Sequence, residues 1–457
     1  MMVSANPATG ERLMEIADHD EPEIERRLAA AFESQRRWAG VPLAERMALL
    51  RRAAAGLRQG KAALARIASL EMGKPITEAL AEVEKCATGF DYYADAGQGI
   101  LADRVVATNA SDSRIVYEPL GLVLAVMPWN YPFWQVMRAA APVLVGGNGL
   151  VLKHASNVPQ CALAIERLFV EAGFPEHLVT TLLAPGDRVG RLIQDRRIAA
   201  VTFTGSTPVG RRIAAQAGEA LKKQVLELGG SDPFIVLADA DVEAAAKVGV
   251  RARFQNTGQS CIAAKRFIVE AAVADRFVEA FCAEVRALRP GDPLDPGATQ
   301  GSMARLNLRE ELDAQVQASV GEGARLLLGG QAIAGPGAFY QPTVLDQVSP
   351  DMTVAREETF GPAAAILRVA DPDEAVRAAN GTPFGLGAAL WTADLDRAAA
   401  LVRRIEAGAV FVNGMVASDP RMPFGGVKES GYGRELGAFG VHEFANAKTV
   451  WTGPAHG

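Results

Sequence analysis

The segment "IAAVTFTGSTPVGRRIAAQAG" (Ile198–Gly218) decides the fold, because an apolar run passes through a glycine turn into a helical pattern. The run at 198–204 predicts a buried strand, and the apolar spacing of 207–218 predicts an amphipathic helix. Gly205 permits the sharp turn between them, and Pro208 suits the first helical turn, where a missing N–H has no intrahelical partner. A strand followed directly by a helix is the building unit of a parallel α/β sheet.

Similar strand–helix pairs surround this segment. Apolar runs alternate with helical patterns at 149–153, 159–173, 178–184, 187–195 and 223–230. This alternation predicts βαβ units and a mainly parallel sheet, the layout of nucleotide-binding folds. A second alternation runs from 233 to 414 and predicts a second α/β unit, with the boundary near Gly229–Gly230. The first hundred residues have mostly helical patterns.

The bulk composition excludes several classes of protein. A chain of 457 residues is long enough for two or three domains, and its net charge of −6 argues against a nucleic-acid partner. No apolar run is long enough to span a membrane, and the N-terminal segment lacks the pattern of a signal peptide, so we expect a cytoplasmic protein. Its four cysteines are then expected to be free thiols. No histidine and cysteine have metal-ligand spacing, so we expect no metal site.

One of these cysteines lies in an unusual setting. A lone cysteine usually packs among apolar neighbours, whereas Cys261 ends the polar, glycine-bearing stretch "QNTGQSC" (255–261). Such a stretch suits a loop better than a core. The pattern therefore favours a reactive thiol over a structural one.

Three further stretches allow both a chemical and a structural interpretation. "FTGSTPVG" (203–210) offers Ser206 and free helical N–H groups to a phosphate, although its G-x-x-x-x-G spacing also fits a simple strand–helix turn. Glu227 in "LELGG" is a buried general base or an exposed strand-end carboxylate. Asn130 in "MPWNYPFWQVMR" is an oxyanion donor or part of an aromatic turn, and Arg138 is a pocket cation or a solvated charge. Together with Cys261 they suggest thiol catalysis beside a nucleotide cofactor.

These stretches, in their order along the chain, resemble the aldehyde dehydrogenase superfamily. The matching motifs are "PWNYP", Leu152–Lys153, "FTGSTPVG", "LELGG", "NTGQSC", "EETFGP" and "PFGGVKESGYGRELG". The resemblance implies an α/β fold with a Rossmann-type cofactor domain, an α/β catalytic domain and a small β oligomerisation element. The bounds expected for these parts are 1–98 with 120–228, 229–431, and 99–119 with 432–457.

The resemblance also implies a role for each site residue. Cys261 would be the nucleophile, Glu227 the base that activates a water, and Asn130 the oxyanion donor together with the backbone N–H of Cys261. The reaction implied is oxidation of an aldehyde through a thiohemiacetal and a thioester. The cofactor, NAD or NADP, would contact Trp129, Lys153, Ser156, Gly205, Ser206, Glu358 and Phe360.

Two departures from the family pattern refine this expectation. Ser156 stands where many NAD-preferring members have a glutamate that repels a 2′-phosphate, so we expect that NADP is accepted alongside NAD. Arg138 and Ser418 match carboxylate contacts of the members that oxidise succinate semialdehyde, which makes that aldehyde the expected substrate. Gln255, however, replaces a second arginine of many such members. The substrate contacts implied are Arg138, Ser418, Gln255, Trp134 and Phe424.

The alternatives to this expectation come from other classes. They are a dehydrogenase of another small aliphatic or carboxylated aldehyde, a non-catalytic binding relative, and a thiol acyltransferase or esterase without a dinucleotide. The retained Cys261, Glu227 and Asn130 disfavour the second, and the cofactor motifs disfavour the third. The extended segment 446–451 is expected to pair with a neighbouring subunit, together with the strand region before Gly121, in a homodimer or homotetramer.

Overall fold

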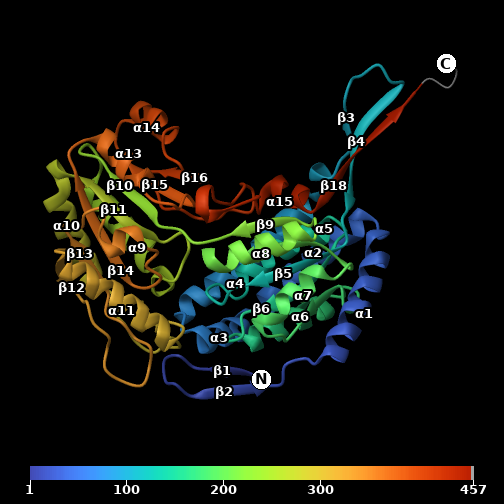
Figure 1. The fold of residues 1–457 in the computed structure, drawn as a ribbon, viewed down its shortest axis with the longest axis horizontal. Helices are drawn as coiled ribbons and strands as arrows, with labels where there is room; N and C mark the ends of the chain where they lie inside the picture. The colour runs from blue at the N-terminus through green and yellow to red at the C-terminus, as the bar shows by residue number, and fades with distance from the viewer. Residues whose placement is uncertain (454–457) are drawn as a thin grey trace.

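The computed structural model describes residues 1–453, which form two large sheets lying end to end (Figure 1). The first sheet has six strands, and all of them run parallel except the short β17. In their order across the sheet, the strands are β17 (Gly431–Tyr432), β9 (Lys223–Glu227), β8 (Ile198–Thr204), β5 (Leu122–Met127), β6 (Gly149–His154) and β7 (Val179–Thr181). The predicted α/β alternation is therefore confirmed.

Both faces of the first sheet are buried, because the strands are apolar on both sides. In β5, Leu122, Leu124 and Val126 pack toward one face, and the residues between them pack toward the other. The first face is covered by α1 (Glu21–Ala39), α7 (Val189–Gln194) and α8 (Thr207–Glu219). The second face is covered by α2 (Leu43–Gln59), α3 (Lys61–Met72), α4 (Ile76–Ile100), α5 (Trp134–Val145), α6 (Pro159–Glu171) and α15 (Gly437–Glu443).

The strand order of the first sheet reverses at β5. The chain continues from β5 to β6 on one side, whereas β8 and β9 are added on the other side. Loops that leave the carboxyl ends of β5 and β8 therefore diverge, and in open parallel sheets ligands bind in the crevice between such loops. The first sheet thus places a ligand crevice beside Met127 and Thr204.

The second sheet repeats this design. Phe234 and Val236 of β10 pack under two helices on one face, and Ile235 and Leu237 pack under four on the other. Its strands, in order, are β12 (Arg325–Leu328), β13 (Thr343–Asp346), β14 (Ala363–Val369), β11 (Ala264–Glu270), β10 (Asp232–Val236), β15 (Gly387–Trp391) and β16 (Ala409–Val412), with only β12 antiparallel. The helices are α9 (Val242–Phe254) and α10 (Ala271–Arg286), then α11 (Leu306–Gly321), α12 (Thr353–Arg356), α13 (Pro372–Asn380) and α14 (Leu395–Val402).

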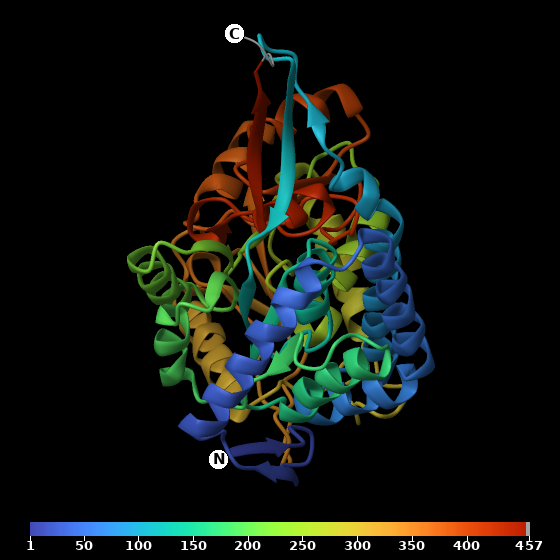
Figure 2. The same cartoon turned by 90° about the vertical axis from the view of Figure 1, so that its right-hand side faces the viewer.

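A third, antiparallel sheet projects from one end of the molecule (Figures 1 and 2). It consists of β18 (Ala445–Thr452), β4 (Asp112–Pro119) and β3 (Arg104–Val105). β18 contains the segment expected to be extended and forms an edge of this sheet. The bounds of the three expected parts of the chain stay a prediction.

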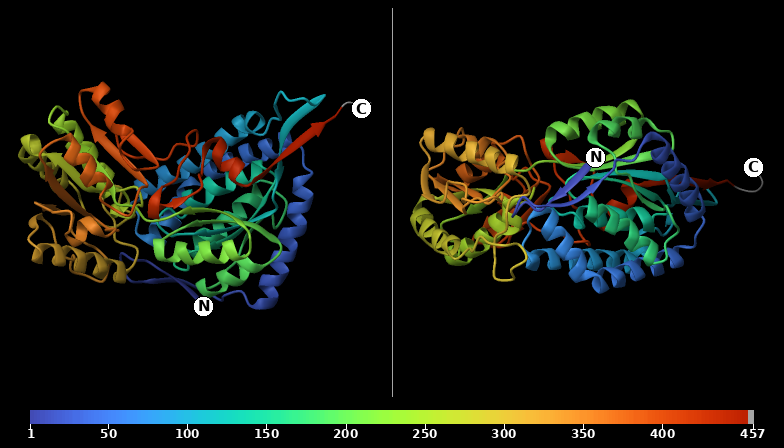
Figure 3. Two further views of the ribbon diagram at one scale, coloured as in Figure 1. Left: turned by 45° about the horizontal axis from the view of Figure 1, so that its top comes forward. Right: turned by 90° about the horizontal axis from the view of Figure 1, so that it is seen from below.

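The first hundred residues differ from their expected pattern in one place. Residues 2–16 form the hairpin of β1 (Met2–Ala5) and β2 (Arg12–Ile16), which reaches the second sheet, where the N–H of Ala338 donates to the carbonyl of Pro7 at 2.8 Å (Figure 3). This hairpin depends on distant contacts, which no local pattern reveals. The helical pattern over residues 43–74 forms two helices, α2 and α3, which meet at Gly60. No helix among residues 1–453 combines the length and the apolar character needed to cross a membrane.

Candidate active site

The two sheets meet at the residues that connect β9 to β10. Glu227 ends β9, and the chain passes through Gly229 and Gly230 into β10. Cys261 lies just before β11, and Glu358 lies in the loop that leads to β14. The carboxyl end of the first sheet therefore faces the amino ends of three strands of the second, and most of the predicted site residues gather there.

The loop that carries the thiol has an unusual backbone. Asn256 and Thr257 take left-handed conformations, with φ of 56° and 55°, and Gly258 follows with φ of 70°. Two successive non-glycine residues in this region are costly and persist only where the surroundings hold them. Part of that restraint comes from Glu78 of α4, whose carboxylate accepts the N–H of Asn256 at 2.7 Å. Burial raises the pKa of Glu78 to about 7.

A set of amide groups joins this loop to the loop after β5. The side-chain amide of Asn256 donates to the carbonyl of Asn130 at 2.8 Å and to the carbonyl of Gln259 at 3.0 Å. Asn130 donates to the same Gln259 carbonyl at 3.1 Å. One N–H of the Asn130 amide is thus used for positioning, and the second remains for a ligand. The N–H of Ala304 donates to the Gln259 side chain at 2.9 Å and fixes it in turn.

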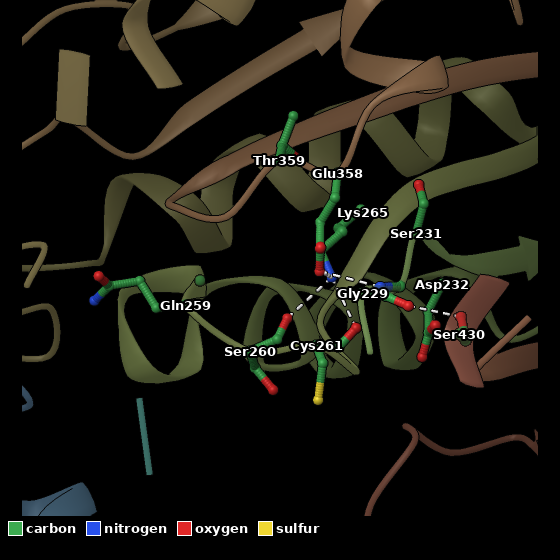
Figure 4. A network of polar contacts seen from close by, with 12 residues as sticks. Gly229, Ser231, Asp232, Gln259, Ser260, Cys261, Lys265, Glu358, Thr359 and Ser430 are labelled. Atoms are coloured by element: carbon green, nitrogen blue, oxygen red, sulfur yellow. Dashed lines mark hydrogen bonds and ion pairs between the residues drawn. The ribbon is translucent and has the colours of Figure 1, made fainter. Parts of the chain in front are cut away.

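A buried lysine ties the thiol loop to the rest of the site (Figure 4). The ammonium group of Lys265 donates to the carbonyls of Ser260 at 3.0 Å and Cys261 at 2.8 Å, and it pairs with Glu358 at 3.2 Å. The same Glu358 oxygen accepts the N–H of Gly230 at 3.1 Å. In Figure 4 the sulfur of Cys261 points away from this network, which leaves the thiol available to a substrate.

The double glycine between the sheets is required by this close packing. A Cβ at Gly230 would lie 2.6 Å from the carbonyl oxygen of Cys261, and one at Gly229 would lie 2.4 Å from a Glu358 oxygen. Neither distance leaves room for a side chain. The hydroxyl of Ser430 donates to the carbonyl of Gly229 at 2.6 Å and holds the connection from the other side.

The Cys261 thiol differs from the other three cysteines, which are buried, whereas Cys261 is half-buried. Desolvation raises the pKa of Cys261 to about 11, although the positive charges of Arg138 and Lys265 oppose the shift. The sulfur is therefore protonated in the resting protein at neutral pH.

Two carboxyl groups share one guanidinium beside the thiol. Glu435 forms a buried ion pair with Arg138 and accepts a hydrogen bond from Thr202 at 3.4 Å. Glu227 is also buried, and neither of its oxygens has a hydrogen-bond partner within the described residues. The pKa of Glu227 is raised well above its ordinary value, mainly by burial and to a smaller extent by the negative charge of Glu435. The positive charges of Arg138 and Arg434 act against this shift.

The predicted cofactor residues follow the carboxyl ends of the first sheet. Lys153 is buried near the end of β6, and burial lowers its pKa, whereas Ser156 is exposed in the following loop. Ser206 precedes the 13-residue helix α8 and makes no capping bond to it, so the N–H groups of that helix start are free for an anion. The chemistry of these donors fits a dinucleotide phosphate.

Two aromatic residues meet between the sheets, Trp129 from the loop after β5 and Phe360 from the loop before β14. The rings of Trp129 and Phe360 meet edge to face with their centroids 5.7 Å apart. Gly205 turns the chain between β8 and α8, and its N–H donates to the carbonyl of Glu227 at 3.0 Å. Gly205, a predicted cofactor residue, is thus in direct contact with the predicted base.

Four of the predicted substrate residues contact one another in pairs, whereas the fifth, Gln255, lies apart from them. The guanidinium of Arg138 lies 4.8 Å from the ring centre of Phe424, and the indole N–H of Trp134 donates to the hydroxyl of Ser418 at 3.2 Å. Gln255 is half-buried in the 3-10 turn Gln255–Gly258, and its side chain makes no hydrogen bond to another described residue. Its role stays a prediction.

Three charged residues of the site were not predicted from the sequence. Glu435 lies inside a motif that matches the family, but no role was assigned to it. Lys265 is the second residue of β11, and a charge in a buried strand is a local sign that it has a buried partner. Lys85 lies within the helical pattern of α4, where a lysine is ordinarily a solvated charge.

Comparisons with known proteins agree with this geometry. The sequence model of the aldehyde dehydrogenase family matches residues 1–450, and the chain belongs to that family. The family resemblance of the motifs is therefore confirmed.

Three similar proteins share nearly the whole chain. A probable NADP-dependent succinate-semialdehyde dehydrogenase of Synechocystis is 51% identical over 98% of this chain and 99% of its own. An NAD(P)-dependent succinate semialdehyde dehydrogenase of Escherichia coli is 50% identical over 98% and 97%. The crystal structure of a succinic semialdehyde dehydrogenase from Streptococcus pyogenes with NADP+ is 36% identical, covers 99% of this chain and 100% of its own, and superposes with a TM-score of 0.97.

The raised thiol pKa has a measurable consequence. The rate at which iodoacetamide alkylates Cys261 should rise about tenfold per pH unit from pH 7 to 10, because the thiolate fraction grows that way below a pKa of about 11. A free cysteine would level off near its pKa of about 8.5. The measurement is the loss of free thiol on the peptide containing Cys261, with Cys261→Ala as the blank. A plateau below pH 9 would contradict this charge assignment.

Proposed function

We propose that this chain oxidises succinate semialdehyde to succinate with NADP+, and that it also accepts NAD+. The observation that carries the proposal is the identity of about half the residues, over nearly the full length, with two proteins of that name. The exposed Ser156 supports acceptance of NADP+, because no carboxylate stands there to repel a 2′-phosphate.

In the proposed reaction, Cys261 is the nucleophile. Its thiol gives its proton to solvent water, and the thiolate attacks the aldehyde carbon. The second N–H of the Asn130 amide and the backbone N–H of Cys261 stabilise the oxyanion. When bound, the nicotinamide cofactor supplies the hydride acceptor. Oxidation leaves a thioester on Cys261. Glu227, in its ionised form, takes a proton from the water that hydrolyses this thioester.

The cofactor in this proposal is held by both sheets. The free N–H groups at the start of α8, with Ser206, bind the pyrophosphate. Lys153 donates to the adenosine ribose. The Glu358 oxygen that is not held by Lys265 accepts from the nicotinamide ribose. Trp129 and Phe360 line the nicotinamide side of the crevice.

A second candidate substrate is a small uncharged aldehyde. The observation in its favour is the ion pair of Arg138 with Glu435, since the predicted carboxylate ligand is already balanced by a protein carboxylate. The two substrates differ by the distal carboxylate alone, so rate measurements separate them.

We also propose a homodimer or homotetramer in the reducing cytoplasm. The support for association is the unpaired edge of β18, on which Trp451 is 53% exposed. The support for the compartment is the need to keep the nucleophilic thiol reduced. A monomer by light scattering at micromolar concentration would contradict the oligomer.

The substrate proposal predicts a preference that steady-state rates measure. With NADP+, kcat/KM for succinate semialdehyde should exceed that for hexanal by at least about tenfold, because charge-assisted hydrogen bonds to a carboxylate contribute about 1.5–3 kcal/mol. A clear preference for hexanal would leave the family assignment intact and would refute the carboxylate contact.

The cofactor proposal predicts the effect of a charge at one position. Ser156→Glu should raise KM for NADP+ by about tenfold or more and change KM for NAD+ much less, because a carboxylate there repels only the 2′-phosphate. Ser156→Gln, with the size of glutamate but no charge, separates repulsion from steric hindrance. Equal losses for both cofactors in Ser156→Glu would show that the residue does not lie beside the 2′ position.

A further inference from the structure

A lysine on α4 lies among the predicted substrate contacts. Lys85 is half-buried, and its ammonium group donates to the hydroxyl of Ser418 at 2.7 Å and lies 4.7 Å from the ring centre of Trp134. The indole of Trp134 donates to the same Ser418 oxygen at 3.2 Å. Because that oxygen accepts twice, the hydroxyl proton of Ser418 remains to be donated elsewhere.

Around Ser418, hydrogen-bond donors outnumber hydrogen-bond acceptors. The ammonium group of Lys85 has two further N–H bonds besides the one used on Ser418, and Ser418 offers its O–H. A carboxylate, which only accepts hydrogen bonds, is the complement of such a group.

The nearby carboxylates are already engaged by other cations. Asp419 is held by Arg421 through hydrogen bonds of 2.8 and 2.6 Å, and Glu82 forms a buried pair with Lys74. No carboxylate within residues 1–453 forms an ion pair with Lys85. Its charge is therefore left for a ligand.

A second cation reinforces the need for an anion. Burial, and then the positive charge of Arg138, lowers the pKa of Lys85 to about 8. Cys261 packs against the cluster of buried residues that includes Trp134 and Phe424, and the guanidinium of Arg138 lies 4.8 Å from the ring centre of Phe424. Arg138 itself is paired with Glu435. Of these two cations, Lys85 is the one that has no carboxylate partner within residues 1–453. The carboxylate of an aldehyde bound at Cys261 would therefore pair with Lys85.

We propose that Lys85 binds the distal carboxylate of the aldehyde substrate, with the Ser418 hydroxyl as a second donor. Lys85 supplies, from α4, the positive charge that Gln255 does not supply from the loop before Cys261. This inference rests on the proposed oxidation of a carboxylated aldehyde. It assigns the substrate specificity of that reaction to Lys85 of α4 rather than to the loop before Cys261.

The experiment compares succinate semialdehyde with butanal, which has the same four carbons and no carboxylate. In Lys85→Met, KM for succinate semialdehyde should rise at least about tenfold with kcat within about threefold, so the ratio of the two kcat/KM values falls at least tenfold. Lys85→Gln, which keeps a hydrogen bond to Ser418, should give the same loss. Lys85→Arg should restore most of the ratio because it restores the charge.

The matched control is Lys61→Met. Lys61 is a neighbouring surface lysine that pairs with Glu84 of α4 at 3.0 Å, and its loss should leave the ratio as in the wild type. Wild-type preference for succinate semialdehyde with an unchanged ratio in Lys85→Gln would overturn the role of Lys85. Equal losses for both aldehydes in both charge-free variants would overturn it as well, since they indicate a structural role. No preference in the wild type itself would refute the proposed substrate, and Lys85 with it.

Discussion

The ammonium group of Lys265 holds the candidate site together. It reaches the carbonyls of Ser260 and Cys261 on one loop and the carboxylate of Glu358 on another. A buried charge is costly unless it is paired and hydrogen-bonded, so these three partners stabilise Lys265 as much as it positions them. The narrow passage at Gly229–Gly230 then brings the first sheet against the same residues. Lys265 thus joins the loop that carries the thiol to the loop that carries Glu358.

The balance of buried charges determines the pKa values of the site residues before substrate binds. One guanidinium, that of Arg138, faces two buried carboxyl groups, and its direct partner is Glu435. Burial raises the pKa values of both Glu227 and Cys261, so the ionised forms of base and nucleophile are both disfavoured before the reaction begins. The thiol is therefore latent, and its proton must leave when the substrate is in place. Lys85 carries the positive charge that Arg138, being paired, cannot offer alone.

Much of the fold was predictable because its signal is local. Apolar runs and helical spacing predict the strand–helix alternation of both sheets, whereas the roles expected for Asn130, Gly205 and Glu227 come from the family resemblance of their motifs. The contacts of the charged residues were not predictable. Lys85 meets a hydroxyl 333 residues away, and Lys265 meets a carboxylate 93 residues away. Periodicity carries no information about such pairs, and the hairpin at residues 2–16 was missed for the same reason.

The central claim is that an aldehyde becomes a thioester on Cys261 and that Glu227 drives its hydrolysis. The most direct measurement is acid quenching of Glu227→Gln after mixing with succinate semialdehyde and NADP+, followed by peptide mapping by mass spectrometry. The account predicts a succinyl thioester that accumulates on the peptide containing Cys261, to a level far above that in the wild type. An adduct on another residue, or no adduct while NADPH still forms, would contradict it.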